Sequence, residues 1–258
     1  MLEAFKLFHK PNSTTNAVIY FIWMLIVMVP WIISSNVGTT HLFPSIDQVG
    51  KGFIQLFNSG LATHIASSLI LCGRAILFSV GVSLAVVYVS PIAALNPIAK
   101  IVSKFRFLPL TGITFYISLV ISQAREMQLW VLVIFMSTYL ITSLMSVLGD
   151  IKEEEFNHAM TLGCTRWESL WQVVIVGRLD YVFDVVRQNL AIVWMMLVTV
   201  ESLLAATGGI GFLIKNSDKF SNQGQLVALQ IIILLIGVGM DYTVNFGRKA
   251  IFKYSTFN

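Results

Sequence analysis

The chain has 258 residues, of which 56% are hydrophobic and only 12% charged, and its formal net charge is +4. Soluble domains carry about 25% charged residues, so this chain has too little charge to cover a water-facing surface. It is therefore expected to be a membrane protein, in which each crossing needs about 20 apolar residues. Its two cysteines form no CxxC pair, which argues against a zinc site or a disulfide framework.

The N-terminal part of the chain carries Lys6, His9 and Lys10 ahead of an apolar run at 17–33. This run is longer than the apolar region of a signal peptide, and it lacks a small-residue cleavage site. We therefore expect it to be retained as a first membrane span, with residues 1–16 ahead of it.

Stretches free of Asp, Glu, Lys and Arg predict the later spans. They cover residues 75–99, 107–124, 127–149, 188–214 and 221–240, and only Glu201 interrupts them. With the first run they predict about six transmembrane helices in an all-α membrane protein. The third stretch is weakly apolar because it holds Pro109 and several hydroxyl residues, so it should lie against protein rather than lipid. Residues 208–224 are expected to form an external loop with a short re-entrant turn.

Basic residues gather in one set of predicted loops. Those loops hold Lys6, Lys10, Lys100, Lys104, Arg106, Lys152, Arg166, Arg178, Arg187, Arg248, Lys249 and Lys253, whereas the alternate loops hold only Lys51, Arg125, Lys215 and Lys219. Loops rich in Lys and Arg stay on the cytoplasmic side of a membrane. We therefore expect a multi-pass protein of the bacterial inner membrane with both termini, 1–16 and 241–258, in the cytoplasm.

The loop at 150–187 is the most polar part of the chain, with eleven of its thirty charged residues. Its apolar residues recur at helical spacing on both sides of Gly163. The pattern predicts two short amphipathic helices with a bend between them, on the cytoplasmic face.

The sequence EEEFNHAMTLGCTRWESLWQVVIV in this loop resembles the cytoplasmic loop of binding-protein-dependent ABC importer permeases. The family pattern is E-A-A, three residues, G, nine residues and I-x-L-P. The corresponding positions here are Asn157, His158, Ala159, Gly163, Val173, Ile175 and Val176. The first Glu, the first Ala and the final Pro of the pattern are thus replaced. The run LGCTRW at 162–167 is similar to the family's L-G-A-S-x-W.

Further matches follow in the same order along residues 43–214. They are FPS at 43–45, Ser68-Leu69 with Arg74 and Gly81, FLPL at 107–110, and Glu201 followed by GGIGFLI at 208–214. These segments resemble the nitrate/sulfonate/taurine/bicarbonate-type branch of the family.

The resemblance implies the type I ABC importer permease fold, with residues 1–258 forming a single transmembrane permease domain. It implies a translocation pathway for a small, anionic solute that a periplasmic or lipid-anchored binding protein delivers. Two cytoplasmic ATP-binding subunits would drive transport, and a second permease copy would complete the pathway. The branch usually uses a homodimer, while the altered E-A-A segment keeps a paralogous partner open. Membrane lipid is expected to surround the chain, and nucleic acid is not an expected partner.

The same resemblance assigns the coupling helix, which would dock on the ATPase, to the loop at 150–187. Its residues would be Asn157, His158, Ala159, Leu162, Gly163, Cys164, Thr165, Arg166 and Trp167. The chain has no G-x-x-x-x-G-K-[ST] motif. We therefore expect it to bind no cofactor and to be no enzyme, with ATP and Mg held by the partner ATPase.

Two charged residues in the predicted spans have alternative interpretations. A charge inside a span costs about 2.5–3.5 kcal/mol on insertion scales, so Glu201 should face the bundle interior. There it would either line or gate the pathway, or form a structural hydrogen bond between helices or across a dimer interface. Arg74 would either extend to the outer interface, which is the favoured interpretation, or attract an anion in the conduit. His64 and His158 have no ligand-type neighbours, so no metal site is expected.

Other classes of membrane protein make different demands. A secondary transporter needs a coupling-ion site between two symmetry-related halves, and a channel needs a repeated pore segment. Neither pattern occurs in the sequence, nor does a catalytic motif such as G-x-S-x-G or H-E-x-x-H. An ion-coupled transporter or a channel is kept as the alternative to an importer permease.

Overall fold

The computed structural model describes residues 13–36, 44–92, 95–204 and 208–251, and this part of the chain contains helices and no strands. The helices are α1 (Ser13–Asn36), α2 (Ile46–Asn58), α3 (Leu61–Val89), α4 (Asn96–Lys104), α5 (Leu110–Val120), α6 (Ala124–Gly149), α7 (Glu153–Thr161), α8 (Arg166–Ser169), α9 (Leu179–Leu203), α10 (Ile210–Lys219) and α11 (Gln223–Ile251). Irregular helical turns follow α4 at Phe105–Phe107 and join α8 to α9 through Leu170–Ile175 and Val176–Arg178.

Five of the described helical segments are long and apolar enough to cross a membrane. They are Thr15–Ile33, Leu61–Val89, Ala124–Gly149, Arg166–Leu203 and Gln223–Arg248. The third predicted span corresponds to α5, which has only 11 residues. At about 1.5 Å per residue, α5 is roughly half as long as a bilayer core is thick. The all-α membrane fold is confirmed, with five long helices and one short apolar helix.

The bundle core lies where α3, α6 and α9 pack together. Leu71 of α3, Leu132 of α6 and Leu197 of α9 are fully buried in one apolar cluster. Ser79 and Ser83 of α3 are also buried, and their hydroxyls donate to the carbonyls of Val133 and Ser137 on α6, both at 3.3 Å. Small hydroxyl residues let membrane helices approach closely while satisfying their own polar groups.

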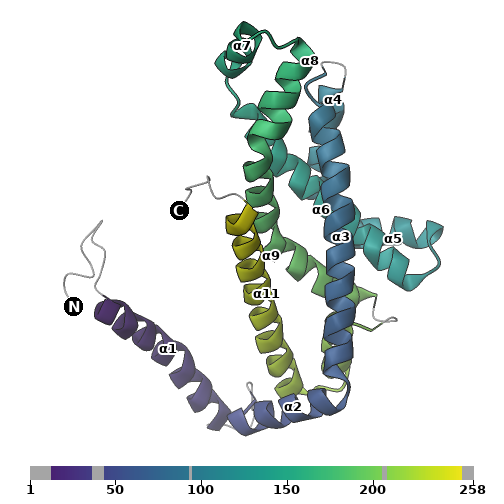
Figure 1. The fold of residues 1–258 in the computed structure, drawn as a ribbon. Coiled ribbons are helices and arrows are strands. Elements are labelled where there is room, and N and C mark those ends of the chain that lie inside the picture. Colours follow the sequence, from purple (N-terminus) through teal and green to yellow (C-terminus); the bar gives the residue numbers. More distant parts are fainter. Residues whose placement is uncertain (1–12, 37–43, 93–94, 205–207, 252–258) are drawn as a thin grey trace.

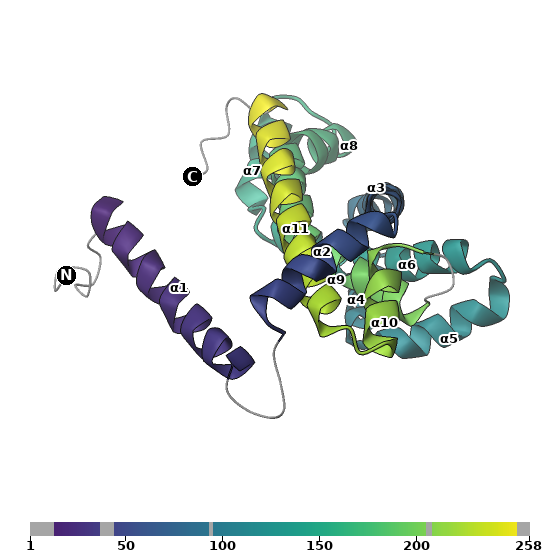
Figure 2. The ribbon, with the colours of Figure 1, turned by 90° about the horizontal axis from the view of Figure 1, so that it is seen from below.

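Helix α2 lies across the end of the bundle at which α11 begins (Figures 1 and 2). It starts at a capping box in which the Ser45 hydroxyl accepts from the Gln48 backbone N–H and the Gln48 side chain accepts from the Ser45 N–H. A Cβ on Gly52 would lie 2.7 Å from the Gly224 backbone. Glycine at this crossing therefore allows α2 and α11 to touch through their backbones.

Helix α1 extends away from the bundle on the side of α11, opposite α5 (Figures 1 and 2). None of its apolar window is buried. It is tied to the start of α2 by the Trp31 indole N–H, which donates to the Pro44 carbonyl at 2.9 Å. The first predicted span is thus a helix that leaves most of its apolar surface exposed within the described residues, while Trp31 packs against the bundle core.

The structure shifts the boundaries of three other predicted spans, of which the sixth continues as a helix to Ile251 instead of ending at residue 240. The second begins at Leu61 instead of residue 75 and ends at Val89, and α4 is separate from it. The fifth begins at Leu179 and ends at Leu203, and residues 210–219 of the predicted external loop form α10. Counting charge-free residues fails at all three spans, because charged and polar side chains of these helices have partners on neighbouring helices.

Candidate functional site

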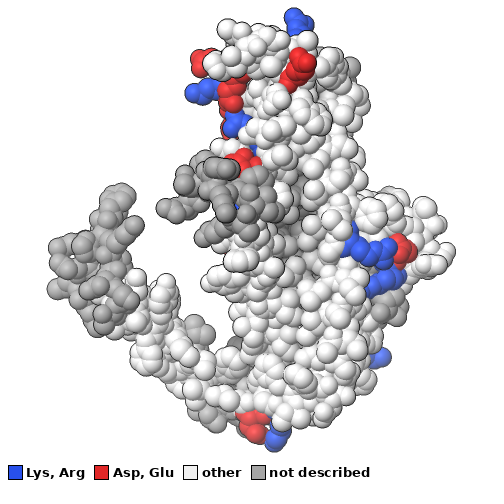
Figure 3. All heavy atoms as spheres, viewed as in Figure 1, with Lys and Arg blue, Asp and Glu red and all other residues white. Residues whose placement is uncertain are grey.

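The elbow between α7 and α8 lies at the opposite end of the bundle from α2 (Figure 1). Acidic and basic side chains gather around this end, whereas most of the surface below it is uncharged (Figure 3). Helix α7 begins with three glutamates, a favourable charge for a helix N-terminus. The polar loop therefore forms a helical projection beyond the apolar bundle.

Gly163 makes the turn of this elbow. Its φ of +91° lies in the left-handed region, which non-glycine residues adopt only at a cost of about 1–2 kcal/mol. The N–H of Gly163 donates to the Met160 carbonyl at 3.0 Å, and that of Cys164 donates to the Ala159 carbonyl at 3.2 Å. These bonds satisfy carbonyls at the end of α7 and fix the direction of the chain as it leaves the helix. The structure thus has the bend that the sequence predicts.

Thr165 starts the second helix of the elbow. Its hydroxyl accepts from the Glu168 N–H at 3.4 Å, while the Glu168 carboxylate accepts from the Thr165 N–H at 2.7 Å and from its hydroxyl at 2.8 Å. This reciprocal capping box satisfies backbone donors at the first turn of α8. Helix α8 is short, and local side chains define where it begins.

The base of the elbow is clamped by an ion pair. Arg178, just before α9, donates to both carboxylate oxygens of Glu155 on α7 at 2.7 and 2.8 Å. The Arg178 guanidinium also lies 5.3 Å from the centre of the Tyr181 ring. A cavity of about 660 Å³ opens beside this pair, between α7 and the turns that follow α8. A movement of the elbow would therefore be transmitted to the start of α9.

The tip of the elbow exposes large apolar side chains. Leu162 is 74% exposed and Trp167 is 71% exposed, with Trp171 also exposed nearby in sequence. Of the nine residues assigned to the coupling helix, Ala159 is buried, Cys164 is half-buried and the others are exposed. The fold thus brings the predicted set together at one elbow. Exposed aromatic anchors of this kind are typical of surfaces that bind another protein.

Glu201 lies in a second polar site, near the end of α9. Its carboxylate is fully buried and accepts from the Ser68 hydroxyl of α3 at 2.9 and 2.7 Å. Arg125 of α6 donates to the same carboxylate at 3.3 Å, and the Gly211 N–H at the start of α10 donates at 3.1 Å. Glu201 therefore joins four helices, α3, α6, α9 and α10, through one carboxylate.

The partners of Glu201 are held in turn by further bonds. The Ser68 hydroxyl accepts from the Ile210 N–H at 2.9 Å, so it links Glu201 to the first turn of α10. Arg125 also donates to the Gln128 side chain at 3.0 Å and to the Ser67 carbonyl at 2.5 Å. Buried polar networks are favourable only when their members are satisfied. In this network the Glu201 carboxylate accepts from the Ser68 and Arg125 side chains and from a backbone N–H at the start of α10.

The chain before α10 is fitted closely to this carboxylate. Gly209 has a φ of +108°, and a Cβ there would lie under 3.0 Å from the Glu201 carboxylate. Its N–H donates to the His64 Nδ1 at 3.1 Å, and the His64 ring stacks on Phe212 at 5.8 Å. The start of α10 is thus bound to α3 at two points, His64 and Ser68.

Arg74 lies outside this network, in the middle of α3. It pairs with Glu126 at 3.3 Å, and the two side chains are 47% and 37% exposed. Sequence reasoning identified Glu201 as a charge that needs an interior position but did not identify Arg125 as its partner. The only signal was the position of Arg125 at the start of a predicted span, since the two residues are 76 positions apart.

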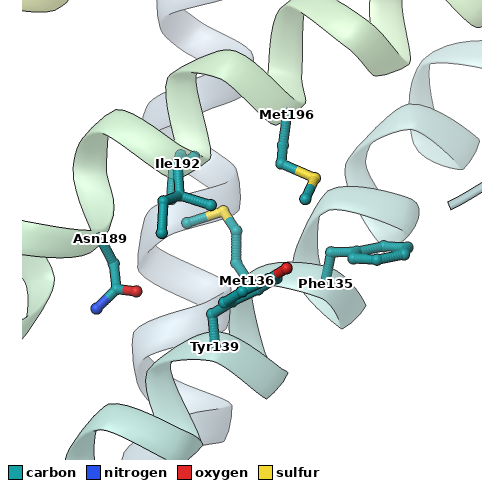
Figure 4. A pocket seen from close by; sticks show the side chains of 7 residues that line it. Phe135, Met136, Tyr139, Asn189, Ile192 and Met196 are labelled. Carbon is teal, nitrogen blue, oxygen red and sulfur yellow. The ribbon is translucent and has the colours of Figure 1, made fainter. Parts of the chain in front are cut away.

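Two further observations limit the kind of site that is present. Within the described residues, no group of three or more His, Cys, Asp and Glu could hold a metal ion. A cavity between α6 and α9, lined by Phe135, Met136 and Tyr139 from one helix and Asn189, Ile192 and Met196 from the other, has a volume of only about 10 Å³ (Figure 4). It could hold a water molecule at most, so this packed seam offers no room for a solute.

Comparisons with known proteins agree with these features. The chain is 28% identical over 203 residues to the taurine transport system permease protein TauC of Escherichia coli, covering 74% of this chain and 70% of that protein. It is 34% identical over 83 residues to a putative ABC transporter permease protein of Methanocaldococcus jannaschii, covering 32% and 31% of the two chains.

The fold also resembles a solved structure, that of a bacterial ABC transporter involved in the import of the acidic polysaccharide alginate. The TM-score is 0.64 at 13% identity, and the match covers 92% of this chain and 95% of that one. No protein-family model matches the sequence.

Proposed function

We propose that the chain is a permease subunit of an ABC importer, in keeping with its similarity to the taurine permease. It would form half of a translocation pathway that separate ATPase subunits open and close. The observation that carries this proposal is the elbow at Gly163, which presents Leu162 and Trp167 beyond the apolar bundle. A permease without a nucleotide site needs a rigid projection of this kind. ATP and Mg would be bound by two ATP-binding subunits in the cytoplasm, and this chain would hold no cofactor.

The clamp between Glu155 and Arg178 gives the elbow a mechanical role. Arg178 directly precedes α9, and both of its bonds to Glu155 are charge-assisted. A push on α7 or α8 would therefore move α9, which crosses the bundle and carries Glu201 near its other end. In this proposal Glu201 is a structural brace that carries the movement to α10, rather than a group that contacts the solute.

A second copy of the chain fits the exposed apolar surface of α1. Helix α1 is joined to the bundle through the start of α2 and extends on the α11 side (Figures 1 and 2). Tyr20 and Trp23 are 74% and 63% exposed on it. Lipid alone could cover such a surface, but a permease bundle of this size needs a second half to enclose a pathway. A homodimer in the inner membrane supplies that half without another gene product.

The membrane orientation follows from the elbow and the basic loops. Arg166 and Arg178 lie at the elbow end, which we place in the cytoplasm. Helix α2 and the start of α11 then lie on the outer side, where a binding protein would deliver the solute. In this orientation Arg74 lies in the middle of a span, where it pairs with Glu126 at the start of α6.

The proposed solute is a small sulfonate-like compound, in keeping with the relative named a taurine transport permease. Its test is ligand identification, by mass spectrometry, on a purified binding protein encoded beside this chain. Recovery of a small sulfonate or a related anion is expected. An isolated gene with no ATPase or binding-protein neighbour would favour the alternative, an ion-coupled transporter or a channel.

A further inference from the structure

A groove of about 900 Å³ runs between α9 and α11. It is lined by residues 230–242 of α11, over a length of about 18 Å at 1.5 Å per residue. Small-molecule sites in proteins have volumes of about 300–1,000 Å³. The groove is therefore large enough for a small solute, unlike the seam between α6 and α9.

The two ends of the groove are polar although both helices are apolar spans. Gln230 of α11 lies at the outer end and is exposed, and Gln188 of α9 is exposed at the inner end. A polar group that faces hydrocarbon without a partner costs several kcal/mol. We therefore expect this face to meet water or protein, and a second copy of the chain would enclose it.

One wall of the groove is fixed in shape. The Trp194 indole N–H donates to the Ile233 carbonyl of α11 at 3.0 Å. A Cβ on Gly237 would lie 3.2 Å from the Trp194 ring, so the ring packs directly on this part of α11. The Trp194 side chain, with its N–H hydrogen-bonded, thus forms one wall of the groove and holds α9 and α11 at a set separation.

The inner end of the groove carries separate charges of both signs. Arg187 of α9 donates from Nε to Asp241 of α11 at 3.0 Å, and their side chains are 31% and 52% exposed. Asp184, also in the lining, pairs with Arg248 at 2.7 Å and is less exposed. Arg248 is not part of the lining, so the lining carries two carboxylates and one guanidinium. This lining gives no general attraction for anions, but it offers a guanidinium and a carboxylate side by side.

We propose that this groove is the solute's path along the permease, and that Arg187 and Asp241 bind a small zwitterion in transit. The anionic group would contact Arg187 and the cationic group Asp241. Each protein charge would then exchange one partner for another, so neither charge is left without a partner while the solute is bound. This inference rests on the proposed permease function and sharpens it, because it specifies a solute with both charges instead of a simple anion.

The test is cysteine labelling in membranes of cells that express the importer. The background is Cys164→Ser, because Cys72 is buried and Cys164 is half-buried. Gln230→Cys and Val238→Cys place a thiol in the groove, and Leu77→Cys is the control, since Leu77 is 76% exposed on α3 outside the groove. Methanethiosulfonates with a sulfonate or a trimethylammonium head react with thiols that contact water.

Both groove thiols are expected to react at least about tenfold faster than the Leu77→Cys thiol. The reagents react with the thiolate, which forms only where the cysteine contacts water. Arg187→Gln should slow the anionic reagent at Val238→Cys by about threefold and leave the cationic reagent unslowed. Taurine and β-alanine, two zwitterions, should protect Val238→Cys, whereas ethanesulfonate should not.

Groove thiols that react no faster than the control would overturn the proposed path. Equal protection by ethanesulfonate, or none by the zwitterions, would overturn the proposed solute class. These labelling rates are independent of ATP-driven uptake. If the groove labels as expected but no ATPase associates with the chain, the proposed importer function fails and the groove assignment stands.

Discussion

Glu201→Ala is expected to lower the thermal unfolding midpoint of the chain in detergent by about 10 °C. Removing one partner of a buried ion pair costs about 3–5 kcal/mol, and a chain of this size shifts by about 2–4 °C per kcal/mol. The cost should fall near the lower end, because the Arg125 side chain is 28% exposed and can reach water. The Gly211 N–H and the Ser68 hydroxyl would also lose their acceptor.

Two further variants test whether the loss of thermal stability is specific to Glu201 or follows from the removal of any carboxylate. Glu126→Ala removes an exposed partner of Arg74 and should shift the midpoint by less than about 3 °C, since exposed pairs contribute about 0–1 kcal/mol. Glu201→Gln keeps the shape but replaces an acceptor with a donor that faces Arg125, so an intermediate loss is expected. Equal midpoints for Glu201→Ala and Glu126→Ala would show that the four-helix brace does not stabilise the fold.

Trp167→Ala is expected to weaken binding of the ATPase to the permease by about 30-fold or more. Aromatic anchors at the centre of an interface cost about 2 kcal/mol or more when truncated, and 1.4 kcal/mol is a factor of ten. Trp167 fits this role because it is 71% exposed at the elbow tip, one residue after the start of α8. The measurement is a titration of the purified ATPase onto the permease in nanodiscs.

Trp130→Ala is the matched control for this prediction. Trp130 is 42% exposed on α6 and its ring contacts Phe78 of α3, away from the elbow. Its truncation should leave ATPase affinity within about twofold of the wild type, as expected for a contact outside the interface. A similar loss in both variants would point to general destabilisation, and no loss in Trp167→Ala would remove Trp167 from the docking surface.

Local sequence patterns were sufficient to predict the parts of the fold that depend on local chemistry. The long apolar runs at 17–33 and 127–149 are helices, and the polar loop contains two short helices that meet at Gly163. The bend at Gly163 was predicted from the pattern of the loop, and its φ of +91° explains why glycine is required there. The resemblance to ABC importer permeases predicts a coupling site at the same elbow.

Long-range pairing set the features that the sequence did not predict. The second span starts at Leu61 because His64, Ser67 and Ser68 are satisfied by α10 and by Arg125, so their polarity does not exclude a helix. Periodicity within one segment carries no information about such partners. The groove between α9 and α11 was also missed, because Arg187 and Asp241 are 54 positions apart and were assigned to a loop and a helix end.

Co-purification of a P-loop ATPase with the affinity-tagged chain tests the proposed coupling site most directly. The wild-type chain is expected to retain the ATPase through detergent extraction. The double variant Gly163→Val and Arg166→Glu should lose it, because a β-branched residue strains the +91° turn and the new charge alters the start of α8. Its thermal midpoint should fall by only a few degrees, since the strain at Gly163 costs about 1–2 kcal/mol and both positions are exposed. Full retention of the ATPase by the double variant, or its absence from the wild-type chain, would contradict the assignment of this elbow as the coupling site.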